Sequence, residues 1–281
     1  MRASDVSAES ASQSGPTANS LAWLTLLGTG TSMGVPMVAC DCPVCTSTDP
    51  RDQRSRTGVS VRHGEQGFLI DTGPELRLQL VREKVNFIDG VIYTHGHADH
   101  VMGMDDLRMF CFRQRDPVPL YCEEPVERIL RSAFGYAFST EHSLHSRPRL
   151  EFQRIDERPF QISGLTVRPI RLIHGTLPVL GFRMGDVAFC TDVSAIPDSS
   201  WPLLQNLGVL ILGAIRDEPH PTHFTVAEAL EVVQRCRPRQ AYLTHISHAL
   251  PHAETNARLP DGVALAYDGL RVPIHLESIG Q

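Results

Sequence analysis

The stretch Thr94-His95-Gly96-His97-Ala98-Asp99-His100 contains three imidazoles and one carboxylate within six residues. It directly follows an apolar run, residues 87–93, whose composition predicts a buried strand. His95 and His97 alternate with a glycine, so we expect both side chains to point to one side. Asp99 and His100 are expected at the start of the next helix. A plain solvated loop rarely has this composition after an apolar strand, so the stretch indicates a metal site at a sheet edge.

The same pattern recurs later in the chain, where predicted strands are followed at once by His or Asp. Three more strand ends carry such residues: His174, Asp192 and His245. A single strand-end His is usually an ordinary core or loop residue, but four such ends favour convergence on one site. With Asp99 and His100 the set has five His and two Asp, enough for two metals and a shared carboxylate. This mixture of ligands suits Zn, Mn or Fe.

A second cluster, Cys40-Asp41-Cys42-Pro43-Val44-Cys45, offers three thiolates within six residues. Thiolates at this spacing favour a tetrahedral zinc site completed by a distant His or Cys. Unconnected or redox-active thiols are the alternative interpretation. The chain has seven cysteines, an odd number, and this pattern fits metal binding in a reducing compartment better than a disulfide framework. We therefore expect a cytoplasmic protein.

The composition indicates a packed globular protein, because 42% of the 281 residues are hydrophobic and 21% are charged. Residues 1–20 are rich in Ser and Ala and are expected to form a disordered tail ahead of a domain at 21–281. The net charge of −6 disfavours nucleic acid as a partner. No apolar run approaches the roughly 20 residues that span a bilayer, so a membrane partner is not expected. A homodimer stays open.

The order of the predicted elements indicates the fold class. Residues 59–62 and 67–70 predict a hairpin, and alternation of strands and helices follows it. Residues 149–161 also alternate like a strand. Early hairpins followed by strand–helix alternation predict an α/β sandwich of two sheets with helices outside.

Three features leave alternatives open. The glycine-rich segment 28–36 is interpreted as a tight turn, and a phosphate cradle is the alternative. Asp71 ends the predicted strand 67–70, where it is a helix cap, an orienting partner of a metal-bound His, or both. The aromatic segment 135–148 is interpreted as a surface loop, with a flap over the site as the alternative.

On the residues quoted above, the chain resembles the metallo-β-lactamase superfamily over nearly all of residues 21–281. The resemblance implies a four-layer αββα sandwich with the metal site at one edge of the two sheets. It also implies two groups of metal ligands and one bridging residue. These are His95, His97 and His174 for one metal, Asp99, His100 and His245 for the other, and Asp192 between them.

A narrower resemblance rests on residues 27–36, the cysteine cluster and Leu243-Thr244-His245-Ile246-Ser247-His248. These segments look like the PhnP group, the phosphoribosyl cyclic phosphate phosphodiesterases of the carbon–phosphorus lyase pathway. The resemblance implies a structural zinc held by Cys40, Cys42, Cys45 and His248. It also implies that His223 contacts the phosphate and protonates the leaving oxygen. A histidine that merely starts a helix is the alternative for His223.

The sequence therefore predicts a binuclear metal-dependent hydrolase, most simply a phosphodiesterase for a small phosphodiester, cyclic ones included. A hydroxide bridging two Mn or Zn ions is the expected nucleophile, with Asp192 as the bridging ligand and His223 as the acid. The alternatives are an RNA 3′-end endonuclease of the tRNA-maturation type and a thioester or lactam hydrolase. The endonuclease needs a basic surface and a flexible arm that grips tRNA. The net charge of −6 disfavours the basic surface, and the sequence has no long Gly/Lys-rich insertion for the arm. A non-enzymatic metal-binding protein is disfavoured because no ligand is missing.

Overall fold

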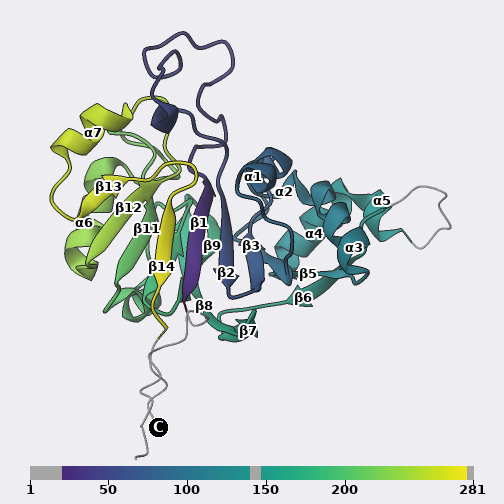
Figure 1. Ribbon diagram of the computed structural model, residues 1–281. Helices are drawn as coiled ribbons and strands as arrows, with labels where there is room; N and C mark the ends of the chain where they lie inside the picture. Colours follow the sequence, from purple (N-terminus) through teal and green to yellow (C-terminus); the bar gives the residue numbers. More distant parts are fainter. Residues whose placement is uncertain (1–20, 140–146, 277–281) are drawn as a thin grey trace, which may run out of the picture.

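Two seven-stranded β-sheets stack face to face in the computed structural model, which describes residues 21–139 and 147–276 (Figure 1). The predicted tail, 1–20, lies outside the described residues. From edge to edge the first sheet contains β14 (Arg271–Ile274), β1 (Ala22–Gly28), β2 (Gly58–His63), β3 (Gln66–Ile70), β4 (Gly90–Ile92), β5 (Val118–Cys122) and β6 (Leu150–Arg154). The second contains β13 (Val263–Leu265), β12 (Gln240–Thr244), β11 (Val209–Gly213), β10 (Val187–Cys190), β9 (Leu177–Met184), β8 (Leu165–His174) and β7 (Phe160–Ile162).

Both faces of each sheet are covered, because the strands carry apolar side chains on both sides. In β3, Phe68 and Ile70 face the core between the sheets, while Leu69 faces the outer helices. In β10, Phe189 faces the same inner core and Ala188 the opposite outer layer. Continuous apolar strands of this kind require cover on both faces. The predicted four-layer αββα sandwich is confirmed.

The helices form the two outer layers. The first sheet is covered by α1 (Leu76–Arg82), α2 (Ala98–Val101), α3 (Arg108–Gln114), α4 (Glu124–Ala133) and α5 (Gly135–Phe138). The second is covered by α6 (Val226–Cys236), and α7 (His252–Arg258) lies beside β13. Short 3-10 helices are η1 (Pro50–Asp52), η2 (Met104–Leu107) and η3 (Asp198–Leu204). Among the described residues, no helix combines the length and apolar character needed to cross a bilayer.

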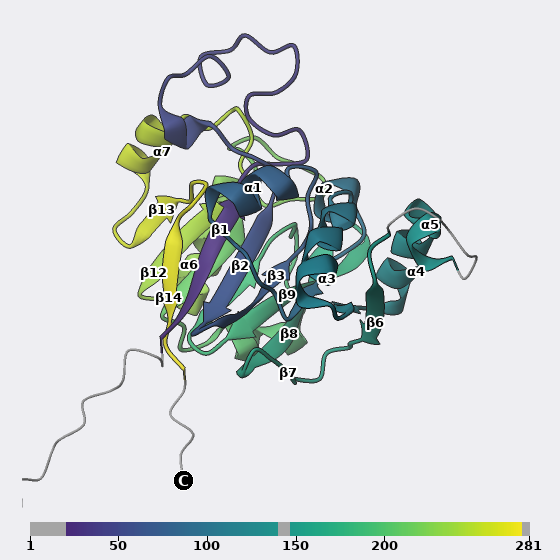
Figure 2. The same ribbon diagram turned by 45° about the vertical axis from the view of Figure 1, so that its right-hand side comes forward.

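Parallel strands bring the strand ends that carry the predicted ligands to one edge of the two sheets. β3, β4 and β5 run parallel in the first sheet, and β10, β11 and β12 run parallel in the second. β8 has the direction of β10, because both are antiparallel to β9. The segment 29–57 projects as a long loop above the upper end of the sheets in Figures 1 and 2, close to α7.

Two predicted strands differ from the structure. The segment 149–161 is not one strand but two, and β6 and β7 belong to different sheets. Asp156 turns the chain between them by accepting the backbone N–H of Arg158 at 2.8 Å, and Pro159 has no N–H for a ladder. The strand expected over 87–93 shortens to β4, and Phe87 is 45% exposed.

The glycine-rich segment is a close-packed crossing of backbones. A Cβ on Gly28 would lie 1.9 Å from the carbonyl oxygen of Arg56, so only glycine fits there. The backbone N–H groups that a phosphate would need are already bound within the protein. Their acceptors are Asp268 for Thr29, the Ser55 carbonyl for Gly30 and the Ile246 carbonyl for Thr31. The predicted tight turn lies at 31–34, where Gly34 N–H donates to the Thr31 carbonyl at 2.9 Å, and the three N–H groups named above are not free to bind a phosphate.

Candidate active site

The seven predicted ligands gather at one edge of the two sheets. They form two groups, His95, His97 and His174 in one, and Asp99, His100, Asp192 and His245 in the other. Within each group the candidate ligand atoms all lie within 4.8 Å of one another. The two groups adjoin, because the ring centroids of His95 and His100 are 4.2 Å apart.

Sharp turns directly after strands position three of the buried side chains. Asp71 follows β3, Asp192 follows β10 and His245 follows β12, with φ of 64°, 51° and 57°. These left-handed conformations are unfavourable for residues with a Cβ and cost on the order of 1–3 kcal/mol each. Such turns project a side chain past the strand end instead of along the next stretch of backbone. The strand-end pattern in the sequence therefore reflects a shared local geometry.

The carboxylate of Asp71 orients the histidine motif, residues 94–100, through hydrogen bonds. Its carboxylate accepts the backbone N–H and the hydroxyl of Thr94, both at 2.8 Å, and Nδ1–H of His100 at 2.7 Å. Helix α1 begins only at Leu76, and its N-terminal cap is Glu75. Of the two roles left open by the sequence, the structure shows the orienting one, and the cap is wrong. With Nδ1 bound to Asp71, Nε2 of His100 faces the group of candidate ligands.

Two other histidines have their tautomers set by similar contacts. Thr94 donates its hydroxyl to Asp71, so it accepts Nδ1–H of His95, at 2.9 Å. The carbonyl of Thr222 accepts Nδ1–H of His174 at 2.6 Å. Both rings therefore turn an unprotonated Nε2 toward the centre of the site, as a metal ligand must.

The site fits divalent cations in its donor chemistry. Nε2 of His95 and Nε2 of His100 are buried without a well-formed hydrogen bond among the described residues, and carboxylate oxygens of Asp192 and Asp99 lie 3.2 and 3.3 Å from Nε2 of His100. Burial lowers the pKa of His95, His97 and His245, which keeps these imidazoles neutral and able to bind a metal. Burial also disfavours a charge on His100, but Asp192 and Asp71 raise its pKa overall. A cation would take the place of that proton.

Asp192 lies between the two groups. Its Oδ2 is 3.2 Å from Nε2 of His100 and 3.3 Å from Nδ1 of His245, and its Oδ1 is 4.0 Å from Nε2 of His174. Thr191 also donates a hydrogen bond to Oδ2, at 2.7 Å. Burial opposes the ionisation of Asp192, but His245 and His100 hold its pKa well below the usual range. The position suits a carboxylate shared by two cations.

His223 belongs to the loop that precedes α6 and lies beside this carboxylate. Its Nδ1 is 4.0 Å from Oδ1 of Asp192, and its ring centroid is 4.5 Å from His174 and 4.8 Å from His245. Burial lowers the pKa of His223 to about 3 in the metal-free protein. The sequence alternative, a histidine that merely starts a helix, does not hold, because Thr225 caps α6.

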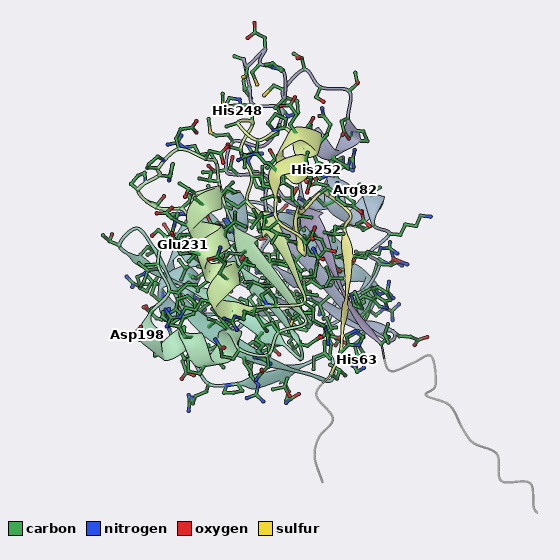
Figure 3. The ribbon with its side chains drawn as sticks, turned by 90° about the vertical axis from the view of Figure 1, so that its left-hand side faces the viewer. His63, Arg82, Asp198, Glu231, His248 and His252 are labelled. Atoms are coloured by element: carbon green, nitrogen blue, oxygen red, sulfur yellow. The ribbon has the colours of Figure 1, made fainter. Side chains whose placement is uncertain are left out.

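The cysteine cluster forms a separate site in the long loop. Sγ of Cys40 and Sγ of Cys42 each lie 3.3 Å from Nδ1 of His248, and Sγ of Cys45 lies 3.7 Å from it. The backbone N–H of Cys45 lowers the pKa of Cys42 to about 6, which favours a thiolate. Figure 3 shows His248 at the end of the molecule where the loop projects, and His63 at the opposite end.

Several supporting residues were not predicted from the sequence. Thr94 and Thr222 fix histidine tautomers, and Thr57 lies with its hydroxyl 3.0 Å from Nδ1 of His245. Only Thr94 had a local signal, its place beside the histidine motif. Part of the segment considered as a flap, 140–146, lies outside the described residues.

Comparison with known proteins agrees with this geometry. Residues 67–246 match the family described as "Beta-lactamase superfamily domain". The chain belongs to this superfamily. A solved structure described as a diphosphatase from the PhnP family is 43% identical to this chain, covers 91% of it and 98% of its own, and has a TM-score of 0.86. The resemblance to the PhnP group is thus confirmed.

Other similar proteins have a lower identity or are only partly covered. The octanoyltransferase of Porphyromonas gingivalis is 35% identical over 90% of this chain, but the chain spans only 52% of that protein. A ribonuclease Z of a Mycobacterium species is 26% identical over 90% of this chain and 96% of its own. Zn²⁺-bound PqqB of Methylobacterium extorquens, 17% identical with a TM-score of 0.74, covers 89% of this chain and 99% of its own and shares the fold. Family and site together show a member of the superfamily whose clustered His and Asp side chains could hold divalent cations.

Proposed function

We propose that this protein is a metal-dependent hydrolase that cleaves a small phosphodiester, with His223 protonating the leaving oxygen. The observation that carries the proposal is the position of His223, 4.0 Å from Asp192 and in ring contact with His174 and His245. The 43% identity to a PhnP-family diphosphatase supports a phosphorus centre over a carbonyl one. The natural substrate is expected to be small, because the net charge of −6 suits nucleic acid poorly.

The proposal assigns the donor groups to two divalent cations, Mn or Zn. One cation would be held by His95, His97 and His174, the other by Asp99, His100 and His245, and Asp192 would bind both. When bound, such a pair supplies Lewis-acid charge and a water that ionises near neutral pH. The cysteine cluster with His248 would hold one structural zinc.

The chain's own residues orient the metal ligands, leave the site open at one side and supply a proton. Asp71 and Thr94 hold His95 and His100 in the tautomers that keep Nε2 free. The open face of the site lies at His97, which is exposed while its neighbour His95 is buried. His223 would deliver a proton from the side of Asp192 to an alkoxide that leaves phosphorus, and the negative charge of a bound phosphodiester would have to raise its pKa from about 3 for it to do so.

A second candidate is hydrolysis of a diphosphate, because the relative with 43% identity is described as a diphosphatase. A phosphate leaving group is less basic than an alkoxide and depends less on a proton donor. The two candidates therefore differ in how strongly they need His223.

A substrate panel with measured metal content tests the proposal. Purified protein loaded with Mn²⁺ or Zn²⁺ is offered cyclic and linear phosphodiesters, diphosphates, a pre-tRNA and a thioester. We expect turnover of small phosphodiesters, and a fall of about 10²–10⁴-fold for His223→Ala with an alkyl leaving group. The fall should be much smaller with p-nitrophenolate, which needs no proton.

Metal content separates the acid role from a ligand role. His223→Ala should keep all its metal, while His174→Ala should lose part of it. No turnover of any phosphodiester by fully metal-loaded protein would contradict the proposal. Equal losses with both leaving groups would remove the acid role from His223.

A further inference from the structure

A network of hydrogen bonds within the loop between β11 and α6, residues 214–225, plays no part in the catalytic scheme. We call this network the brace. Its base is closed by two backbone hydrogen bonds, from Ile215 N–H to the Phe224 carbonyl and from Val226 N–H to the Arg216 carbonyl, both 2.9 Å. The guanidinium of Arg216 then donates to the carbonyls of Glu218 at 3.2 Å and Pro219 at 2.9 Å. These contacts shape the loop up to His220.

His220 continues the brace on the other side of the loop. Its Nδ1 accepts the backbone N–H and the hydroxyl of Thr222, each at 3.3 Å. A backbone N–H can only donate, so Nδ1 of His220 is unprotonated and its proton sits on Nε2. No hydrogen bond of that Nε2 is found within 21–139 and 147–276.

Thr222 connects the brace to the metal site. Its carbonyl accepts Nδ1–H of His174 at 2.6 Å, the contact that turns Nε2 of His174 to the centre. The methyl group of Thr222 also packs against Gly175, where a Cβ would come within 2.8 Å of it. The next residue is His223, whose ring lies 4.9 Å from His220. A shift of Thr222 would therefore move a ligand and the proposed acid together.

We propose that His220 is a positioning residue, which acts through Thr222 on His174 and His223 by means of its Nδ1 acceptor. It does not contact the substrate. The effect on catalysis rests on the proposed function, but the effect on His174 does not. Arg216 is the second part of the same brace.

Two amide variants separate the two ring nitrogens. The Oδ1 of asparagine stands where Nδ1 stands, and glutamine places its amide near Nε2. We expect His220→Ala to weaken the affinity of the apo protein for Zn²⁺ by about tenfold, the lower range for residues that support a metal ligand. His220→Asn should recover most of that affinity, and His220→Gln should not. A competition titration against a chromogenic chelator measures this without any substrate.

The kinetic arm uses a phosphodiester with an alkyl leaving group. The alanine variant should lower kcat and leave KM within about twofold, because a displaced His223 would protonate the leaving oxygen less well in the transition state. Rescue by glutamine but not by asparagine, or a raised KM with unchanged kcat, would mean that Nε2 contacts the substrate and would overturn the proposal. Wild-type Zn²⁺ affinity in the alanine variant would also overturn it.

Arg216→Gln keeps the proposal testable if His220→Ala does not fold. This variant loses the bonds to the Glu218 and Pro219 carbonyls and should weaken Zn²⁺ binding in the same direction. If the wild-type protein turns over no phosphodiester, the proposed function fails, while the Zn²⁺ titration still decides the role of His220.

Discussion

Asp71 shows how one carboxylate can determine the geometry of several metal ligands. It is fully buried, and it binds Thr94 and His100 directly and His95 through the hydroxyl of Thr94. Burial alone raises the pKa of Asp71, and His100 and Thr94 act against this. The sequence placed Asp71 at a strand end but left its role open, because its partners are 23 and 29 positions away.

Asp71→Asn should therefore disturb the metal site without removing a ligand. An amide cannot accept at both of its terminal atoms, so either Thr94 or His100 loses its acceptor. We expect Zn²⁺ affinity to fall by about 10–100-fold, measured by competition titration of the apo protein. Asp89→Asn is the control, because Asp89 binds Gly67 and Ser163 and no part of the site. Equal affinities in the two variants would contradict the role of Asp71.

At the level of elements, the crossing at Gly28 fixes how the long loop leaves β1. The segment 28–31 lies between the strand-like segments at 54–56 and at Ile246, to which it forms isolated bridges. This arrangement places the hydroxyl of Thr57 3.0 Å from Nδ1 of His245. Glycine at this crossing is a packing requirement, and the glycine-rich pattern by itself does not distinguish such packing from ligand binding.

Gly28→Ala should destabilise the protein. The added Cβ would meet the Arg56 carbonyl at 1.9 Å and the side-chain amide of Gln79 at 2.6 Å, so backbone must move. We expect a loss of about 1–3 kcal/mol in the free energy of unfolding, as for other overpacked interiors. Gly135→Ala is the control, since nothing lies within 4 Å of its Cβ position, and its change should stay within about 0.5 kcal/mol. Urea unfolding curves of both variants measure the free energy of unfolding. Equal free energies for the two variants would contradict the packing requirement at Gly28.

Elements with a clear local pattern were predictable. The hairpin β2–β3 follows from alternation, and the end of β12 is marked by His245 directly after it. The division of 149–161 between two sheets was not predictable, because both halves have the same alternation. Which sheet a strand joins depends on partners distant in the sequence.

At the level of the whole molecule, the long loop 29–57 is fixed to the segment that follows β12. Besides the contacts of His248 with the cysteines, Asp52 accepts the N–H of His252 at 2.8 Å, and buried Arg54 contacts Nδ1 of His252 at 3.0 Å. His248 and His252 lie in the same region in Figure 3. Because His245 precedes His248 by three residues, the cysteine site and the catalytic edge share one short segment.

Cys42→Ser should remove one equivalent of metal and leave two. Loss of a thiolate opens the tetrahedral set, and the protein should lose the stability that the bound zinc adds. Metal analysis of the purified protein and a thermal unfolding curve measure both effects. Cys111→Ser is the control, because Cys111 lies buried between the carbonyls of Leu107 and Arg149, away from the cluster. Unchanged metal content in Cys42→Ser would show that the cluster holds no zinc.

The sequence by itself determined the fold class and the candidate ligands. Strand periodicity and residues placed at strand ends are local features, and seven ligands at four strand ends are visible in one dimension. Only the tertiary structure decided how these residues are oriented. Asp71, Thr57, Thr222 and His220 act through contacts that join separate strands and loops, and contacts of this kind set the tautomers of His100, His174 and His220. Hydrogen-bond direction depends on where backbone and side chains meet in space, and no local pattern contains that information.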